Sequence, residues 1–434
     1  MNIVNKLLRH ELINGSFYIF IGSIFSNILA FIFNLFLVRN LAASDYGIYA
    51  SLLSIIALFG IPAQAFTPVI VRFATSYFSK QEVNKARFFY FKSFKYIFIV
   101  SLCIFWLIVI FSHFLLNFFH LNNVYYIILM AGIIAFSYLS LVNNAFLQSL
   151  LKFGFMSFIG GFGSLLKLIV GVILVFMGFR VFGGLFAVMF MSIASILLGF
   201  IPLRFLFKKT DKTKVVISKR EIFAYAIPTT IAVLGLTSFI SMDVILVRHF
   251  FNSEQAGLYA GLSLVGRVIF YFTGPIPMVM FPLIIKRHAL GKNFNNLFYL
   301  AILLVLLPSF SIMVFYFFFP GFVVNLFLGG KNYLQIVPYI GLIGFFITIF
   351  NILNVCVNFF LSLKKTNIAW VVAVGAIMQI ILISLFHQSF YQIIGISIFT
   401  TLLVLIAVVG YFIKNYVNIN ELKDSLALIN NPKT

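Results

Sequence analysis

Charged residues are scarce in this sequence. Of its 434 residues, 9% are Asp, Glu, Lys or Arg, whereas 63% are hydrophobic. A soluble domain carries about 25% charged residues, and a soluble fold of this length leaves too much surface in water to hide so much apolar area. The composition therefore excludes a soluble protein and predicts that lipid surrounds most of the chain.

Strict alternation of apolar and polar residues, the pattern of a membrane β-barrel, is also missing. The apolar stretches run for the roughly 20 residues or more that a transmembrane helix needs. The run that begins near residue 14 is too long for the apolar region of a cleavable signal peptide, so we expect it to be the first membrane helix. We predict twelve spans, at 14–39, 46–72, 89–112, 123–150, 153–178, 181–207, 221–248, 256–285, 296–320, 334–363, 366–387 and 390–414.

Patterns of catalysis are missing as well. The two cysteines, Cys103 and Cys356, lie inside apolar runs, which favours small core residues over a disulfide. No pair of the six histidines has metal-ligand spacing, and no glycine loop is followed by Lys-Ser or Lys-Thr. We therefore predict no catalytic residue, no metal site and no cofactor, and we do not expect an enzyme.

Acidic residues number only nine against 30 Lys and Arg, which gives a formal net charge of +21. Nucleic-acid binding would explain such a charge, but its distribution follows membrane topology. On the predicted spans, 24 of the 30 basic residues lie on the side that holds both termini, and four lie on the other side: Arg39, Arg180, Arg248 and Lys331. By the positive-inside rule both termini are cytoplasmic. We expect a bacterial inner-membrane protein whose basic loops lie near anionic membrane lipids, and no nucleic-acid partner.

The two halves of the chain repeat three short segments in the same order. Leu-Val-Arg ends at residues 39 and 248, Tyr-Gly-Ile-Tyr-Ala at 46–50 matches Ala-Gly-Leu-Tyr-Ala at 256–260, and Pro-Val-Ile-Val-Arg at 68–72 matches Pro-Leu-Ile-Ile-Lys at 282–286. Each half holds six predicted helices, an even number, so the repeats are parallel. We predict an all-α polytopic fold of about twelve helices in two six-helix lobes related by a pseudo-two-fold axis along the membrane normal. The predicted parts are an N-terminal lobe at 1–207, a basic cytoplasmic linker at 208–220, a C-terminal lobe at 221–414 and a cytoplasmic tail at 415–434.

These repeated segments, with Tyr-Ala-Ile-Pro at 225–228 and Asp243, resemble the polysaccharide-transporter branch of the multidrug/oligosaccharidyl-lipid/polysaccharide (MOP) exporter superfamily. That branch includes the Wzx-type flippases of O-antigen and capsule repeat units, and the resemblance covers essentially the whole chain in length and topology. It implies a central cationic cavity and a substrate made of an oligosaccharide on undecaprenyl pyrophosphate, which is moved to the outer leaflet. A polysaccharide polymerase and a chain-length regulator are further expected partners. Related lipid II flippases carry several cavity arginines on helices 1, 2, 7 and 8, of which this chain has only Arg267 squarely inside a helix.

Charges inside the membrane are costly, so they are the first candidates for function. Arg267, in predicted helix 8, is expected to be a cavity cation, because a guanidinium offers phosphate a planar pair of donors; the alternative is a structural salt bridge. Asp243, in predicted helix 7, is expected to carry the coupling proton or sodium ion, or to be a permanent partner of Arg267. Lys167, in the glycine-rich helix 5, is expected to face the cavity or to reach a helix carbonyl.

Four further residues are candidate substrate ligands. Arg39 and Arg248 occupy matching repeat positions at the predicted outer ends of helices 1 and 7, where interfacial anchoring is the alternative. Asn34 and Gln64 are polar positions on helices 1 and 2, which could bind sugar hydroxyls or bond to neighbouring helices.

Three functions are compatible with this sequence. A flippase of lipid-linked oligosaccharide, working by alternating access and coupled to an ion, fits the net basic set of cavity candidates. A multidrug or cation exporter of the same superfamily would favour acidic cavity residues instead. A membrane polysaccharide polymerase or ligase would need a large outward loop with catalytic Arg or His residues, and the predicted outward loops carry few charges.

Overall fold

The computed structural model describes residues 11–41, 43–118, 123–207, 219–251, 253–328 and 331–416. Within these ranges the chain is helical and contains no strand. Ten stretches are long and apolar enough to cross a membrane; one of them, Phe153–Phe207, contains two predicted spans, and the predicted span in Ala43–Ser79 lies outside the ten. The prediction of an all-α, multi-pass membrane protein with about twelve spans is confirmed.

The chain divides into two compact units. The first comprises Met1–Thr230 and Met278–Phe298, and the second comprises Ile231–Pro277 and Tyr299–Thr434. The boundaries of these units therefore fall within helices, whereas the predicted linker at 208–220 lies almost wholly outside the described residues. The lobes 1–207 and 221–414 stay a prediction.

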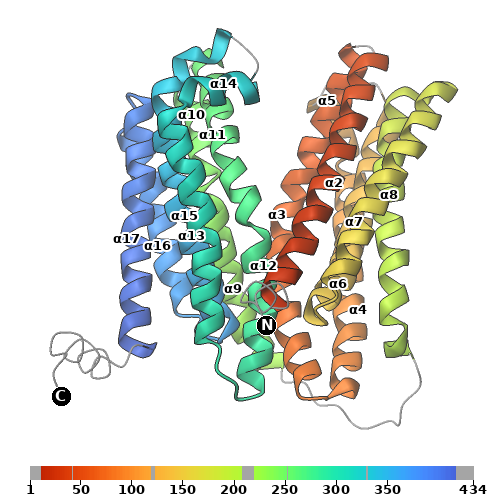
Figure 1. Cartoon of the computed structure of the whole chain (residues 1–434). Helices are drawn as coiled ribbons and strands as arrows, with labels where there is room; N and C mark the ends of the chain where they lie inside the picture. Colours follow the sequence, from red (N-terminus) through yellow and green to blue (C-terminus); the bar gives the residue numbers. More distant parts are fainter. Residues whose placement is uncertain are drawn as a thin grey trace, which may run out of the picture. The chain divides into compact units, whose positions relative to one another are not determined.

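The first unit is built from seven consecutive helices, joined by parts of three later ones, α9, α12 and the first residues of α13 (Figure 1). α7 packs extensively against both α2 and α8, and the chain turns back between α7 and α8 at Gly178, whose φ of +89° suits glycine. The elements are α2 (Glu11–Asn40), α3 (Ala43–Ser79), α4 (Val83–Ile110), α5 (Ser112–Phe118), α6 (Val124–Ser149), α7 (Phe153–Leu174), a π-helical turn (Val175–Phe179), α8 (Arg180–Leu203) and a 3-10 turn (Arg204–Phe207), with the beginning of α9 (Lys219–Phe239), most of α12 (Pro275–Ala289) and the first residues of α13.

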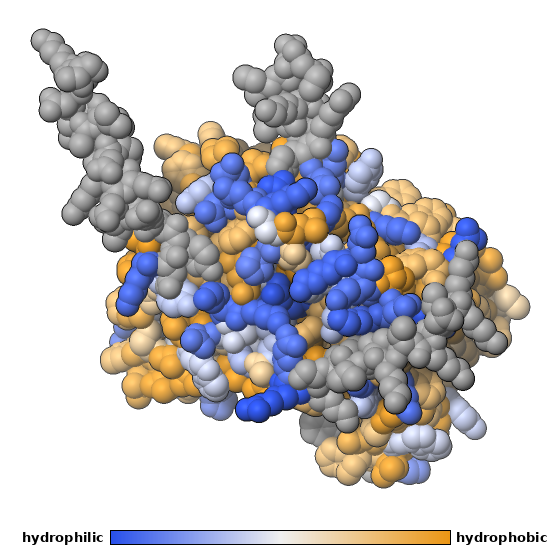
Figure 2. All heavy atoms as spheres, turned by 90° about the horizontal axis from the view of Figure 1, so that it is seen from below, coloured by the Kyte–Doolittle hydropathy of each residue, from blue (hydrophilic) through white to orange (hydrophobic). Residues whose placement is uncertain are grey.

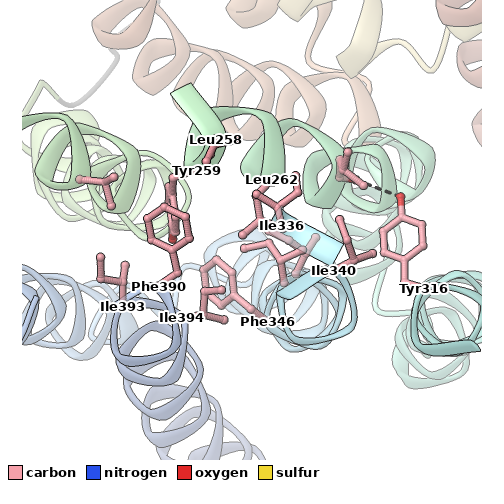
Figure 3. Close-up of a cluster of buried hydrophobic side chains, with 14 of the residues drawn as sticks. Leu258, Tyr259, Leu262, Tyr316, Ile336, Ile340, Phe346, Phe390, Ile393 and Ile394 are labelled. Atoms are coloured by element: carbon pink, nitrogen blue, oxygen red, sulfur yellow. Dashed lines mark hydrogen bonds between the residues drawn. The ribbon is translucent and has the colours of Figure 1, made fainter. Parts of the chain in front are cut away.

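The second unit is centred on α15 (Ile340–Ser362), most of whose side chains are buried. Around it lie the end of α9, α10 (Met242–Phe250), α11 (Ser253–Thr273), α13 (Asn295–Phe318), α14 (Pro320–Leu328), a 3-10 helix (Lys331–Tyr339), α16 (Ile368–Leu385) and α17 (Phe390–Tyr416). Figure 3 shows the buried apolar cluster in which Tyr259 and Leu262 of α11 meet Ile340 and Phe346 of α15 and Phe390 of α17. This cluster fixes the face of α11 that carries Tyr259.

Two predicted spans are wrong in one respect, because the structure interrupts them. The span 221–248 is two helices, since α9 ends at Phe239 and α10 begins at Met242. The span 256–285 is also two helices, α11 and α12, with a break at Gly274 before the helix-starting Pro275. Their repeat counterparts, α2 and α3, run without a break, and α3 continues to Ser79 although Pro62 and Pro68 lie inside it.

The outer surface of the helices is strongly apolar. Phe31, Phe176 and Phe318 are 68%, 72% and 75% exposed, as expected for side chains that contact lipid rather than water. Figure 1 places the α3–α4 and α12–α13 loops of the first unit at the lower end, and these loops contain Lys80 and Lys292 of the predicted cytoplasmic side. Figure 2, seen from below, shows many hydrophilic side chains on this face.

Candidate functional site

In the first unit, Lys167 lies where α7 packs closely on α2. Small residues allow this approach: a Cβ added to Gly22 of α2 would lie 2.5 Å from the Cβ of Ser157, and one added to Gly171 would collide with the ring of Phe33. The ammonium of half-buried Lys167 lies 5.3 Å from the centroid of the Phe33 ring. This cation–π contact stabilises the Lys167 charge within the helical bundle. Asn34, the residue after Phe33 in α2, is also half-buried.

In the second unit, the interruption between α9 and α10 leaves backbone carbonyls that need partners, since a helix end cannot bond its own last carbonyl groups. Arg267 of α11 donates from Nη2 to the carbonyl of Ile240 at 2.6 Å. Gln379 of α16 donates from Nε2 to the carbonyl of Phe239 at 3.2 Å and to Ser397 Oγ of α17 at 2.9 Å. Side chains from two neighbouring helices therefore bond to the break, and Ser397 of a third helix, α17, bonds to one of these side chains.

Asp243 lies in the first turn of α10, directly after this break. It is 1% exposed, and Tyr259 of α11 donates its hydroxyl to Asp243 Oδ2 at 2.9 Å. The amide groups at the start of a helix favour a negative charge there. Tyr259 is itself fully buried, with its ring 5.3 Å from that of Phe390 (Figure 3). Tyr259 is thus the side-chain donor to this carboxylate, whose charge the backbone amides of Asp243 and Val244 also stabilise.

The second carboxylate oxygen, Asp243 Oδ1, is buried and has no hydrogen-bond partner among the described residues. Among the described residues of the second unit, three further buried oxygens share this property: Ser238 Oγ of α9, Gln379 Oε1 of α16 and Thr401 Oγ1 of α17. Contacts link their positions, because Gln379 bonds to the residue after Ser238 and to Ser397, one turn before Thr401. Buried polar atoms nearly always have partners, so the unpaired Asp243 Oδ1 is suited to hold a proton.

The structure decides one of the alternatives for Arg267. Asp243 and Arg267 both lie at the α9–α10 break and interact electrostatically, but they form no ion pair within 4.0 Å. The direct salt bridge considered from the sequence is therefore absent between these two described residues. Arg267 is instead a partner of a backbone carbonyl, and its Nε is buried without a hydrogen bond.

The remaining predicted residues are placed by backbone alone. Arg39 lies in α2, Gln64 in α3 and Arg248 in α10, and their side chains fall outside the described part of the structure. The structure therefore brings Asp243 and Arg267 together in the second unit and places Lys167 and Asn34 at the α2–α7 contact of the first.

Sequence reasoning missed the supporting residues Tyr259, Gln379 and Ser397. Tyr259 belonged to a recognised repeat segment, and its counterpart Tyr49 is also buried, with its ring 6.4 Å from that of Phe33. A signal for Gln379 existed as well, since it is an uncharged polar residue in the middle of an apolar helix. Neither observation could reveal the bonds to Asp243 and Phe239, which depend on how the helices pack.

Solved structures with this arrangement of helices are membrane transporters. A multidrug resistance MATE family transporter of the MOP superfamily, in an outward-facing conformation, matches with a TM-score of 0.77 at 11% identity, over 92% of this chain and 93% of its own. The Vibrio cholerae MATE transporter VcmN, as an aspartate variant, matches with 0.79 at 12%, over 94% and 97%. A MOP superfamily transporter from Pyrococcus furiosus matches with 0.75 at 14%, over 96% and 98%. The protein has the fold of these MOP-superfamily transporters.

The sequence decides the branch. Residues 36–338, well over half of the chain, match the family described as polysaccharide biosynthesis protein, and the chain belongs to this family. The resemblance to the polysaccharide-transporter branch of the superfamily is thereby confirmed. The search of curated proteins gave no match.

Proposed function

We propose that this protein is a flippase that moves undecaprenyl-pyrophosphate-linked oligosaccharide repeat units across the bacterial inner membrane for O-antigen or capsule assembly. The observation that carries the proposal is the combination of a polysaccharide biosynthesis family with a MOP-transporter fold. A family that serves glycan assembly through a transporter has to move a glycan or its lipid-linked precursor. A polysaccharide polymerase and a chain-length regulator would use the product on the outer side.

The proposed substrate ligands are the basic and polar residues Arg267, Lys167, Arg39, Arg248, Asn34 and Gln64. Lys167 supports this assignment best, because a half-buried ammonium held on an aromatic ring has no carboxylate within 4.0 Å among the described ion pairs. A diphosphate is the natural partner of such a cation. Alternating access would expose these groups first to one leaflet and then to the other.

Asp243 is the proposed coupling residue. Its buried carboxylate has one oxygen bonded to the Tyr259 hydroxyl and one oxygen with no side-chain partner, and unpartnered oxygens of Ser238, Gln379 and Thr401 lie on α9, α16 and α17 of the same unit. A proton on Oδ1, or a sodium ion shared with these oxygens, would satisfy the charge and the unpaired atoms together.

The function is tested by deletion in a strain that lacks redundant flippases. We expect surface polysaccharide to disappear and undecaprenyl-linked repeat units to accumulate on the cytoplasmic leaflet, because no other route would carry them across. The wild-type gene on a plasmid should restore both. Normal surface polysaccharide in the deletion strain would contradict the proposal.

Export of cationic drugs is a second candidate, favoured by the fold that the chain shares with a multidrug resistance transporter. The same deletion strain distinguishes the two, since loss of a drug exporter raises sensitivity to a cationic dye such as ethidium and leaves surface polysaccharide intact.

The proposed orientation places both termini in the cytoplasm. We expect an impermeant thiol reagent added to intact spheroplasts to label Gln388→Cys, in the exposed α16–α17 connection, and not Lys292→Cys, in the α12–α13 loop. The exposed native Cys103 should first be replaced by serine, whereas Cys356 is buried. The reverse labelling pattern would overturn the orientation.

A further inference from the structure

We propose that Arg267 is a positioning residue of the ion site. By bonding to the carbonyl of Ile240, Arg267 holds α10 in place, and with it Asp243. The inference rests on the proposed coupling role of Asp243. It assigns Arg267 a role that acts through the backbone, distinct from its proposed role as a substrate ligand.

The first step is the geometry of the break. Only Ile240 and Ser241 connect α9 to α10, and α10 is nine residues long. A helix this short has little stability of its own, so contacts at its ends determine where it lies. The bond of 2.6 Å from Arg267 to Ile240 joins a full positive charge to a carbonyl at the end of α9, where the helix dipole favours a cation.

The second step is that one helix holds the break at two points. Tyr259 and Arg267 both belong to α11 and lie eight residues apart, which corresponds to about 12 Å along a helix. Tyr259 bonds to the side chain of Asp243, and Arg267 bonds to the backbone three residues before it. Movement of α10 relative to α11 would have to break both bonds, so Arg267 fixes the direction in which Asp243 Oδ1 points.

The third step concerns the orientation of the guanidinium. Its Nη2 is engaged with Ile240, and its Nε is buried with no hydrogen bond among the described residues. The edge formed by Nε and Nη2, one of the planar pairs of donors that a phosphate could bind, is therefore turned towards the protein. What the bond to Ile240 requires is a single cationic donor, and lysine also provides one.

The test uses the fact that lysine replaces arginine as a single donor to a carbonyl but not as a planar pair of donors to a phosphate. Purified full-length protein is unfolded by heat while NaCl replaces choline chloride at constant ionic strength, and in a second series while pH is varied. In the series that stabilises the wild type, the unfolding temperature is plotted against the concentration of Na⁺ or H⁺. The concentration that gives half of the maximal stabilisation is then read from this plot. Arg267→Lys should leave this concentration within about twofold of wild type, and Arg267→Met, which keeps the stem and removes the donor, should raise it about tenfold or more.

Arg287→Met is the matched control, because Arg287 also donates to a backbone carbonyl, that of Asn293 at 3.5 Å, at an exposed helix end. It should leave the half-maximal ion concentration unchanged. A wild-type ion response in folded Arg267→Met would overturn the positioning role. If Arg267→Met does not fold, Arg267→Lys decides alone, since a tenfold weaker ion response in this variant would also overturn it.

Asp243→Asn separates failure of the inference from failure of the proposed coupling site. Loss of the ion response in Asp243→Asn, together with the expected pair of results at Arg267, supports the inference. An intact ion response in Asp243→Asn would overturn the proposed coupling site and the positioning role with it. If Asp243→Asn loses the ion response while Arg267→Met responds as the wild type does, the proposed coupling site is supported and only the positioning role is overturned.

Discussion

Asp243→Asn is expected to abolish the dependence of transport on an imposed ion gradient. Asparagine keeps the shape of the side chain and still accepts the hydroxyl of Tyr259, but it carries neither a charge nor an exchangeable acidic proton. Coupling between two ligands is typically worth about 5- to 150-fold, so gradient-driven flipping of lipid-linked oligosaccharide in vesicles should fall by about that factor. Binding of the lipid-linked substrate should remain.

The matched control is Tyr259→Phe, which removes the hydroxyl donor and leaves the carboxylate and the contact with Phe390 in place. It should weaken ion dependence without eliminating it. If a well-folded Asp243→Asn protein responds to the gradient as the wild type does, the coupling ion is carried elsewhere.

Lys167→Met is expected to weaken binding of undecaprenyl pyrophosphate about tenfold or more. A hydrogen bond to a charged group contributes about 1.5–3 kcal/mol, and each 1.4 kcal/mol corresponds to about a tenfold change in affinity. Methionine retains a flexible apolar stem beside Phe33, so the α2–α7 contact should persist. Binding to purified protein in lipid nanodiscs, measured at two salt concentrations, gives the change in affinity.

Arg180→Gln is the control for this loss of charge. Arg180 belongs to the same unit and its side chain is 76% exposed, with its guanidinium 3.9 Å from the Asp45 carboxylate. Its replacement should leave diphosphate binding close to wild type. Equal binding by wild type and Lys167→Met would remove Lys167 from the substrate site, and full activity of Lys167→Arg would show that charge alone is required there.

Local sequence was enough to predict the membrane class and the approximate spans. Hydropathy over about 20 residues reflects how each segment partitions into lipid, and this property does not depend on the rest of the fold. The beginning of α7 at residue 153 and of α17 at residue 390 agree with the predicted spans for this reason. The interruption after Phe239 was not predictable in this way, because the apolar run continues across it.

The candidate site was predictable by residue type but not by contact. Asp243 and Arg267 stood out as charges in apolar helices, yet their partners are Tyr259 and the Ile240 carbonyl rather than each other. Lys167 stood out equally, but its contact with Phe33 joins helices more than 130 positions apart in the sequence, as the numbering shows. The hydrogen-bond and ring partners of these charged residues are determined by how the helices pack, which the composition of a single segment does not reveal.

The nine-residue α10 also bears on how the protein enters the membrane during synthesis. It carries Asp243, Arg248 and His249, and a charge near the centre of an isolated helix opposes insertion by about 2.5–3.5 kcal/mol. The donor that bonds to Asp243 is Tyr259, which the ribosome adds sixteen residues later on α11. The segment from α9 to α10 therefore gains this polar partner only when α11 has been synthesised, so the cost of placing Asp243 in lipid is offset only once both segments are present.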